Sequence, residues 1–246
     1  MQAYEGEQTS VEHLPFEVRV ARADELMAVA QMRASAYGRH LPAVGAQLVR
    51  PEMADYEMGC EVFVAVSRFD NSLLGTLRTH TNLLRPLPLE ASIRLPDEYQ
   101  GKRMVEATRL SVPGGSQASL VRNALFKAFF LYAAAQDLDW MVVTGRRPVD
   151  RIYDSLLYTD VAGPGAFYEM EHVGGVPHRV MSMAVAEAEP IWRRAAHPLY
   201  KFAFVTRHVD IDISGARDLA AARQTLKQQG QPGAAAMFRP TLTLAN

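Results

Sequence analysis

The stretch MVEATRLSVPGG, residues 104–115, decides the expected fold, because it has the pattern of a buried strand that ends in a tight turn. Pro113 and the two glycines after it cannot continue a strand ladder. In an ideal strand Glu106 and Arg109 point to opposite faces, since successive side chains alternate. Glu106 could take a proton from a group bound beside it. Alternatively, Glu106 and Arg109 form a structural ion pair at the edge of the sheet.

A long apolar segment follows this turn and completes a strand–turn–helix unit. Residues Leu120 to Ala135 are apolar on nearly every side, which predicts a helix buried against a sheet. Ser116 and Ser119 are candidate caps for its N-terminus. The turn at Gly114 and Gly115 can present backbone N–H groups to an anion or to a carbonyl oxygen.

The composition is that of an ordinary globular protein and excludes several classes of function. Charged residues make up 22% of the 246 residues and the net charge is −1, so nothing indicates a nucleic acid or an anionic membrane as partner. The single cysteine, Cys60, excludes an internal disulfide and fits a reducing, cytoplasmic location. No segment is long and apolar enough to span a membrane, and Met1 to Ser10 has no signal-peptide core. No cluster of Cys or His predicts a metal site.

The order of the expected elements divides the chain into a leader, one domain and a tail. Residues 1–15 have the pattern of a flexible leader, residues 16–213 that of a mixed α/β domain, and residues 214–246 that of a polar helix followed by a mobile tail. The expected strands are residues 16–21, 60–66, 73–79, 104–112, 139–145, 167–170 and 179–185. The expected helices are residues 24–37, 120–135, 149–157 and 187–196.

Arg33 interrupts the apolar stripe of the first expected helix. Leu26, Ala30 and Tyr37 share its face at helical spacing. Arg33 could lie along the surface with its charged end in water, or it could point into a site that binds an anion such as a carboxylate. The segment from Gly38 to Gly59 has no clear period, which is typical of a lid or a substrate loop.

Six short motifs stand on the expected elements in a fixed order. They are Arg33-x-x-x-Tyr37, Asp55-Tyr56, Leu74-Gly75-Thr76-Leu77-Arg78, Glu106-x-x-Arg109, Tyr153-Asp154-Ser155-Leu156-Leu157-Tyr158 and Thr206-x-His208-x-Asp210-Ile211. From Phe16 to Ile213 the chain thereby resembles the acyl-homoserine-lactone synthases and, more closely, the long-chain N-acyl amino acid synthases of the FeeM type. The resemblance implies an α/β, GNAT-like acyltransferase fold, in which a mixed central sheet is flanked by helices.

The resemblance also implies roles for individual residues. Glu106 matches the catalytic carboxylate, and Tyr153 is a candidate to protonate the leaving thiolate, with a plainly packed aromatic as the alternative. The residues expected to bind the substrate are Arg33, Tyr37, Asp55, Arg78 and Arg109. The residues expected to bind the thioester or its carrier are Gly114, Gly115, Arg122, Arg146 and Arg147.

Three departures from the family pattern bear on the substrates. The turn from Pro113 to Ser119 lacks the Gln/Arg-x-x-Gly-x-Gly/Ala pyrophosphate loop of GNAT enzymes. We therefore expect acyl-phosphopantetheine on an acyl carrier protein as the donor, with acyl-CoA as the alternative. No aromatic residue lies near Ala43, where the lactone synthases keep one for S-adenosylmethionine, so we expect a different amine. Tyr158 replaces the Gly expected after Leu157, so we expect a loop of different shape there.

Together these features predict an N-acyltransferase that moves a long-chain fatty acyl group to the amine of an amino acid, with no bound cofactor. We expect Arg33 to bind the carboxylate of the acceptor, while Arg109 could instead be a structural residue anchored by Asp55. The acyl chain needs an apolar tunnel, whose candidate residues are equally good as plain core: Phe126, Phe129, Phe130, Trp140 and Met141.

The expected partners are an acyl carrier protein and an amino acid, with transient membrane contact through a lipid product. Two other interpretations stay open. The chain could be a CoA-dependent GNAT acetyltransferase that acts on a small amine. It could also be a non-catalytic module that binds a lipid or an acyl carrier.

Overall fold

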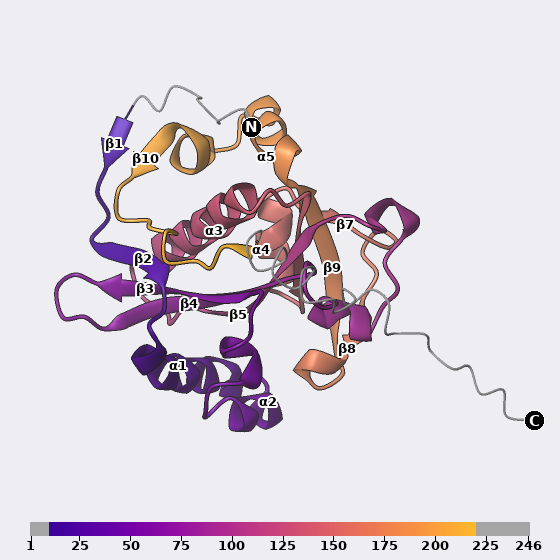
Figure 1. Cartoon of the computed structure of the whole chain (residues 1–246), viewed down its shortest axis with the longest axis horizontal. Coiled ribbons are helices and arrows are strands. Elements are labelled where there is room, and N and C mark those ends of the chain that lie inside the picture. Colours follow the sequence, from indigo (N-terminus) through magenta and orange to yellow (C-terminus); the bar gives the residue numbers. More distant parts are fainter. Residues whose placement is uncertain (1–9, 220–246) are drawn as a thin grey trace, which may run out of the picture.

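The computed structural model describes residues 10–219, which form a mixed central sheet with helices on both faces (Figure 1). The eight strands of this sheet run in the order β2–β3–β4–β5–β6–β9–β7, and β8 pairs with β9. Only β5 and β6 are parallel neighbours, and the other pairs are antiparallel. The strands are β2 Phe16–Val20, β3 Cys60–Ser67, β4 Leu73–Thr81, β5 Met104–Ser111, β6 Trp140–Gly145, β7 Thr159–Asp160, β8 Tyr168–Met170 and β9 Val176–Ala184. The expected sheet flanked by helices is confirmed.

The helices form a layer on each side of the sheet. In Figure 1, α1 (Leu26–Gly38) and α2 (Pro42–Gln47) lie on one side, and α3 (Ala118–Ala135) and α4 (Asp150–Ser155) lie on the other. The last helix, α5 (Val185–Arg194), contacts α3 and β9. Within residues 10–219 no helix has both the length and the apolar character needed to cross a bilayer.

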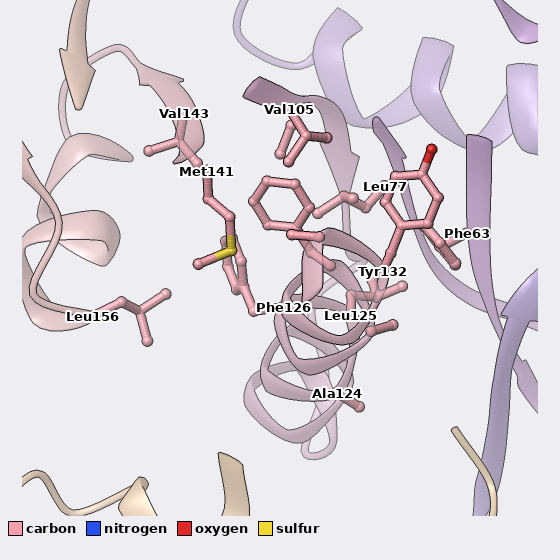
Figure 2. Close-up of a cluster of buried hydrophobic side chains, with 14 of the residues drawn as sticks. Phe63, Leu77, Val105, Ala124, Leu125, Phe126, Tyr132, Met141, Val143 and Leu156 are labelled. Atoms are coloured by element: carbon pink, nitrogen blue, oxygen red, sulfur yellow. The ribbon is translucent and has the colours of Figure 1, made fainter. Parts of the chain in front are cut away.

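Side chains of β3 alternate between the two faces of the sheet, so they pack into two different hydrophobic cores. Phe63 belongs to the core under α3, whereas Val62 and Val64 belong to the core under α1. Tyr132 of α3 packs edge-to-face on Phe63, with ring centroids 5.6 Å apart (Figure 2). Burial of one such large apolar side chain stabilises a fold by roughly 1.5–3 kcal/mol. This cluster therefore holds α3 across the centre of the sheet.

Shorter elements connect these layers. They are β1 Ser10–Glu12, β10 Thr206–His208, single 3-10 turns at Ala23–Glu25, Met53–Asp55, Pro88–Ala91, Asp97–Tyr99 and Glu171–Val173, and a π-helical turn at Lys201–Val205. The segment from 38 to 59, expected to be a lid or a substrate loop, contains α2 and one of these turns. Neither candidate serine caps α3, because its first flanking residue is Gln117, which makes no capping hydrogen bond through its side chain.

The ends of the domain differ from the expected leader and tail. β1 pairs in parallel with β10, and the Leu14 N–H donates to Asp210 Oδ2 at 2.7 Å, so residues 10–15 belong to the fold. Residues 214–216 form a turn and a bend, and the backbone becomes helical only at Leu219, the last described residue. The Arg217 side chain is held by the Glu61 carboxylate at 2.8 Å. The rest of the expected leader and tail, residues 1–9 and 220–246, lies outside the described residues.

The central strands β5 and β6 diverge in the middle of the sheet. Their pairing runs from Met104–Trp140 to Ala107–Val143 and then stops. β5 continues to Ser111, and β6 continues to Gly145. Beyond Ala107 this edge of β5 pairs with no strand within residues 10–219, so backbone N–H groups on it can face whatever binds between the two strands.

Candidate active site

A cavity of about 270 Å³ occupies the space between the diverging strands. Residues 107–111 of β5 and Val112 after it form one wall, and residues 144–146, where β6 ends, form the opposite wall. The C-terminal part of α1 contributes Tyr37, α4 contributes Tyr153, and the segment after β8 contributes His172. Polar and aromatic groups from five elements thus converge on one concave site, as is typical of a ligand pocket.

A bulge in β5 sets the direction of Arg109. Thr76 pairs with Ser111 and Arg78 pairs with Thr108, so β5 has one more residue than β4 between these pairs. Arg109 lies in this bulge with φ +53°, in the left-handed region that non-glycine residues seldom occupy. The extra residue interrupts the alternation, and Arg109 donates to Glu52, which also accepts a hydrogen bond from Arg78 of β4. The face assigned to Arg109 by ideal strand alternation is therefore wrong.

Three buried arginines and two carboxylates form one network beside the cavity. Arg33 Nη1 and Arg78 Nη1 both donate to Asp55 Oδ1, at 2.7 and 3.1 Å. Arg78 Nη1 also donates to Glu52 at 2.9 Å. Arg109 donates to Glu52 through Nε and Nη2, at 2.8 and 2.6 Å. Three guanidinium groups against two carboxylates leave one positive charge in excess.

This network departs from the expected roles of Arg33 and Asp55. Arg33 is 1% exposed, does not line the cavity and pairs with Asp55, so its placement does not fit contact with an acceptor. The carboxylate that anchors Arg109 is Glu52 and not Asp55. Arg109, by contrast, lines the cavity, and its buried Nη1 has no hydrogen-bond partner in the described part of the chain. Tyr37 places its ring 5.7 Å from the Arg109 guanidinium carbon.

In Glu52 and Arg109 the neighbouring charges shift the pKa in the direction opposite to the effect of burial. Burial would raise the pKa of Glu52, but hydrogen bonds from Arg109 and the charge of Arg78 outweigh it and lower the pKa to about 2. Burial would lower the pKa of Arg109, but Glu52 outweighs it and the pKa is raised. Both groups are therefore charged at neutral pH. Arg33 keeps two buried nitrogens, Nε and Nη2, without partners within residues 10–219.

Glu106 lies behind the cavity wall and is completely buried. Its Oε2 accepts the Leu89 N–H at 3.0 Å, and its Oε1 has no hydrogen-bond partner among the described residues. Burial raises the pKa of this carboxyl to about 8, although the Leu89 N–H and the charge of Arg78 act in the opposite direction. A carboxyl group with such a pKa can hold or release a proton near neutral pH, as a general base requires.

Tyr153 lines the cavity from α4 and is packed on both sides. Its ring meets Phe126 edge-on at 5.9 Å and lies 6.1 Å from the ring of Tyr158. Burial raises the pKa of the Tyr153 hydroxyl, so it stays protonated at neutral pH and can donate a proton. Gly145 permits this position, because a Cβ there would lie 2.8 Å from the Tyr153 ring.

The residues expected to bind the thioester lie in three different places. Arg146 lines the cavity. Gly114 and Gly115 are exposed between the cavity wall and α3, and Arg122 lies on the first turns of α3. Arg147 is exposed beyond the cavity, with its guanidinium carbon 4.9 Å from the Phe167 ring centroid. Of this set, only Arg146 contacts the cavity directly.

A second, almost wholly apolar cavity of about 50 Å³ lies on the α3 side of the sheet. Phe126, Phe130 and Met141 line it, together with side chains of α5 and the π-helical turn. Figure 2 shows Phe126 and Met141 on this side of the sheet. Phe129 is plain core, and Trp140 packs on Tyr99 in another cluster, so neither lines this cavity. Phe126 and Tyr158 line the second cavity and contact Tyr153, which lines the first.

Two residues of the site, Glu52 and His172, were not predicted from the sequence. Glu52 lies in a loop and pairs with Arg109 across 57 positions of the chain. His172 lies in the turn Glu171–Val173, and its carbonyl oxygen accepts a hydrogen bond from Arg109 Nη2 at 3.1 Å. Neither belongs to a motif or breaks an apolar stripe, so no local signal marks it. No group of three or more His, Cys, Asp or Glu within residues 10–219 could hold a metal ion.

Comparison with known proteins agrees with this architecture. The structure of FeeM, an N-acyl amino acid synthase from uncultured soil microbes, matches with a TM-score of 0.54 and 16% identity, over 76% of this chain and 99% of FeeM. BjaI, a CoA-dependent acyl-homoserine lactone synthase solved with SAM and isopentyl-CoA, matches with a TM-score of 0.56 and 12% identity, over 85% of this chain and 99% of BjaI. No curated protein sequence matches the chain.

A sequence model of one family, described as N-acyl amino acid synthase FeeM, matches residues 28–183. These residues run from α1 to β9 and include both walls of the cavity. They make up more than half of the chain. The protein therefore belongs to the FeeM family of N-acyl amino acid synthases and is an acyltransferase with the GNAT fold.

Proposed function

We propose that this protein transfers a long-chain fatty acyl group from the phosphopantetheine thioester of an acyl carrier protein to the amine of an amino acid. The observation that carries the proposal is the cavity between β5 and β6, with Arg109 in its wall and Glu106 behind it. An amino acid needs a cation for its carboxylate and a proton acceptor for its amine, and this site offers both.

Arg109 is the residue we propose for the acceptor's carboxylate, in place of Arg33. Its Nη1 is buried without a partner in the described residues, and an unpaired buried donor is costly until a ligand satisfies it. The excess positive charge of the buried network favours an anionic ligand. Glu52 holds two other nitrogens of the same guanidinium group and so fixes its orientation.

The same residues can carry amide formation. The amine loses a proton toward Glu106 as its nitrogen attacks the thioester carbon. Open N–H groups on the β5 edge can stabilise the negative oxygen that develops. The C–S bond then breaks, and the leaving thiolate takes a proton from Tyr153. The amide product and the free thiol result.

The apolar cavity under α3 is the proposed place for the end of the acyl chain. The rings of Phe126 and Tyr158 separate it from Tyr153, and the proposal requires the acyl chain to pass between these rings. Each buried methylene contributes about 0.8 kcal/mol, which gives such a cavity a strong preference for long chains.

Electrostatics supports the proposed donor, an acyl carrier protein. The turn before α3 and the N-terminus of this helix are suited to a phosphate group. Arg122 on α3 and the exposed Arg147 after β6 are the arginines that we propose to contact an acidic carrier protein. The structural match to a CoA-dependent synthase keeps acyl-CoA as the alternative donor.

The test is incubation of the protein with decanoyl carrier protein or decanoyl-CoA and the twenty amino acids, followed by mass spectrometry. We expect a decanoyl amino acid, formed faster from the carrier protein. Faster reaction from decanoyl-CoA would reject the carrier as donor. Acylation of small amines by acetyl-CoA, without any product from decanoyl donors, would reject the proposed function.

Replacing Arg109 by Lys tests recognition of the carboxylate. Lys keeps the charge but loses the planar fork that binds a carboxylate with two hydrogen bonds, so we expect the KM for the amino acid to rise by about 10- to 100-fold. The KM for the acyl donor should change little. The methyl ester of the amino acid should be a poor acceptor for the native enzyme. An ester used as well as the free acid would contradict the role of Arg109.

Replacing Ala188 by Leu tests the acyl cavity. Ala188 is buried on α5 and lines the second cavity, so a larger side chain occupies space that the chain end needs. Loss of room for about two methylenes corresponds to roughly tenfold lower kcat/KM for decanoyl than for butyryl donors, relative to the native ratio. Ala186→Leu, at an exposed position of the same helix, is the matched control. An unchanged chain-length preference would place the acyl chain elsewhere.

Charge reversal at Arg147 tests carrier docking. Arg147 is exposed and does not line the main cavity, so Arg147→Glu should spare a short pantetheine thioester. With the carrier-bound donor we expect kcat/KM to fall about tenfold at low salt and less at high salt. Arg94→Glu changes the charge of a side chain that is 88% exposed and serves as the control. Equal losses with both donors would argue against docking at this surface.

A further inference from the structure

Two polar groups at the back of the cavity lack the partners that buried groups normally have. His172 lines the cavity, and neither nitrogen of its ring makes a hydrogen bond to any described residue. Its Nε2 lies 3.9 Å from Glu106 Oε1, the carboxyl oxygen that also has no hydrogen-bond partner in the described chain. The separation is about 1 Å longer than a hydrogen bond, and such contacts often close when substrate binds.

The positions of these two groups differ in a way that matters for substrate. The side chain of Glu106 is completely buried and does not line the cavity, whereas that of His172 is 16% exposed and does. An amine bound in the cavity therefore meets the imidazole before it can meet the carboxyl group.

We propose that the His172 imidazole makes the direct contact with the amine of the acceptor, and that Glu106 receives the proton through His172. This inference rests on the proposed function and names the group that performs its proton transfer. His172 is then a catalytic residue, and Glu106 holds and positions the proton behind it.

The neutral amine donates one N–H to Nε2 of the neutral imidazole while its nitrogen forms a bond to the thioester carbon. The proton moves to Nε2 of His172, the ring nitrogen that faces Glu106, and passes from there to the Glu106 carboxylate. The C–S bond breaks, and the thiolate takes a proton from Tyr153. The enzyme then returns the Glu106 proton to Tyr153 through solvent.

The surroundings set the protonation of both groups. Burial, Arg109, His178 and Arg78 lower the pKa of His172 to about 4, against a smaller opposing effect of Glu52, so the imidazole is neutral and can accept a proton. Burial raises the pKa of Glu106 to about 8, with Glu90 acting in the same direction and the Leu89 N–H, Arg78 and Arg109 opposing it, so the carboxylate that receives the proton forms as the pH rises toward 8. The 3-10 turn that carries His172 is anchored by the bond from Arg109 to the His172 carbonyl oxygen.

Replacement of His172 by Gln or Asn is the first part of the test. Both side chains keep a polar group but cannot take a proton, and two variants guard against a failure of one to fold. With decanoyl-pantetheine and the twenty amino acids we expect kcat to fall by about 100-fold or more at unchanged melting temperature. His13→Gln, at a side chain that is 76% exposed and far along the chain, is the control.

A second acceptor separates proton transfer from a structural role. The nitrogen of aminooxyacetate is much less basic than an amine, so its attack depends less on a protein base. We expect less than a tenfold loss with this acceptor in the His172 variants, against the about 100-fold loss with amino acids. Equal losses with both acceptors, or turnover within threefold of native, would overturn the inference.

The last measurement is independent of turnover. In the native protein the NMR signals of the His172 ring should shift with an inflection near the pKa of Glu106, about 8. The inflection should disappear in Glu106→Gln. Its absence in the native protein would show that the two groups do not interact. A native enzyme that acylates aminooxyacetate but no amino acid would overturn the proposed acceptor. In that case the titration would still show whether His172 and Glu106 interact.

Discussion

Turnover by Glu106→Gln should fall by about 100- to 10,000-fold, because the amide cannot take the proton that the amine must lose. The fold should survive, since the amide oxygen of Gln can still accept the Leu89 N–H that Glu106 Oε2 accepts in the native protein. The measurement is kcat under saturating donor and acceptor. Glu187→Gln, at an exposed position of α5, is the control. A well-folded variant with native turnover would exclude Glu106 from proton transfer.

The same variant has a predicted signature in stability. The carboxyl of Glu106 has a usual pKa of 4.5, raised to about 8 in the fold. Between these two values the native state keeps a proton that the unfolded chain has released, so this group stabilises the fold below pH 4.5 and loses that contribution as the pH rises to 8. The loss is about 1.4 kcal/mol for each pH unit in this window. Glu106→Gln removes it, so the stability of the variant relative to native should rise from pH 5 to pH 8 in urea unfolding.

Asp55→Ala should lower the free energy of unfolding by about 3–5 kcal/mol, the largest stability effect we expect in this protein. Asp55 Oδ1 accepts hydrogen bonds from both Arg33 and Arg78, and its Oδ2 accepts the Glu52 N–H at 2.8 Å. Removing the carboxylate leaves Arg33, which is 1% exposed, without a counter-ion. Urea unfolding at constant pH measures the change.

Two further variants show whether buried charge is the cause. Glu57 pairs with Arg85 at the surface, so Glu57→Ala should cost less than about 1 kcal/mol. Adding Arg33→Met to Asp55→Ala should recover part of the loss, because it removes a charge that has no partner and keeps an apolar side chain of similar length. If the network stabilised the fold no more than a surface ion pair does, Asp55→Ala would lower the free energy of unfolding as little as Glu57→Ala does. Adding Arg33→Met would then recover nothing.

The sequence by itself determined the architecture around β5. The apolar run after the Gly114–Gly115 turn could only be buried as a helix against a sheet, and α3 lies there. The same local patterns placed most strands correctly, because a strand with one or two buried faces carries its periodicity in its own residues. The sequence also singled out Arg33 as a charge in an apolar stripe, and the structure pairs this arginine with Asp55.

Only the tertiary structure decided how the site is assembled. One extra residue in β5 turns Arg109 to another face, and nothing in the sequence marks a bulge, since bulges arise from pairing with a neighbouring strand. Glu52 and His172 reach Arg109 across 57 and 63 positions of the chain. Contacts over such distances depend on how whole elements pack, and local periodicity carries no information about them. For that reason the residues that orient Arg109 and face Glu106 emerged only when the chain was folded.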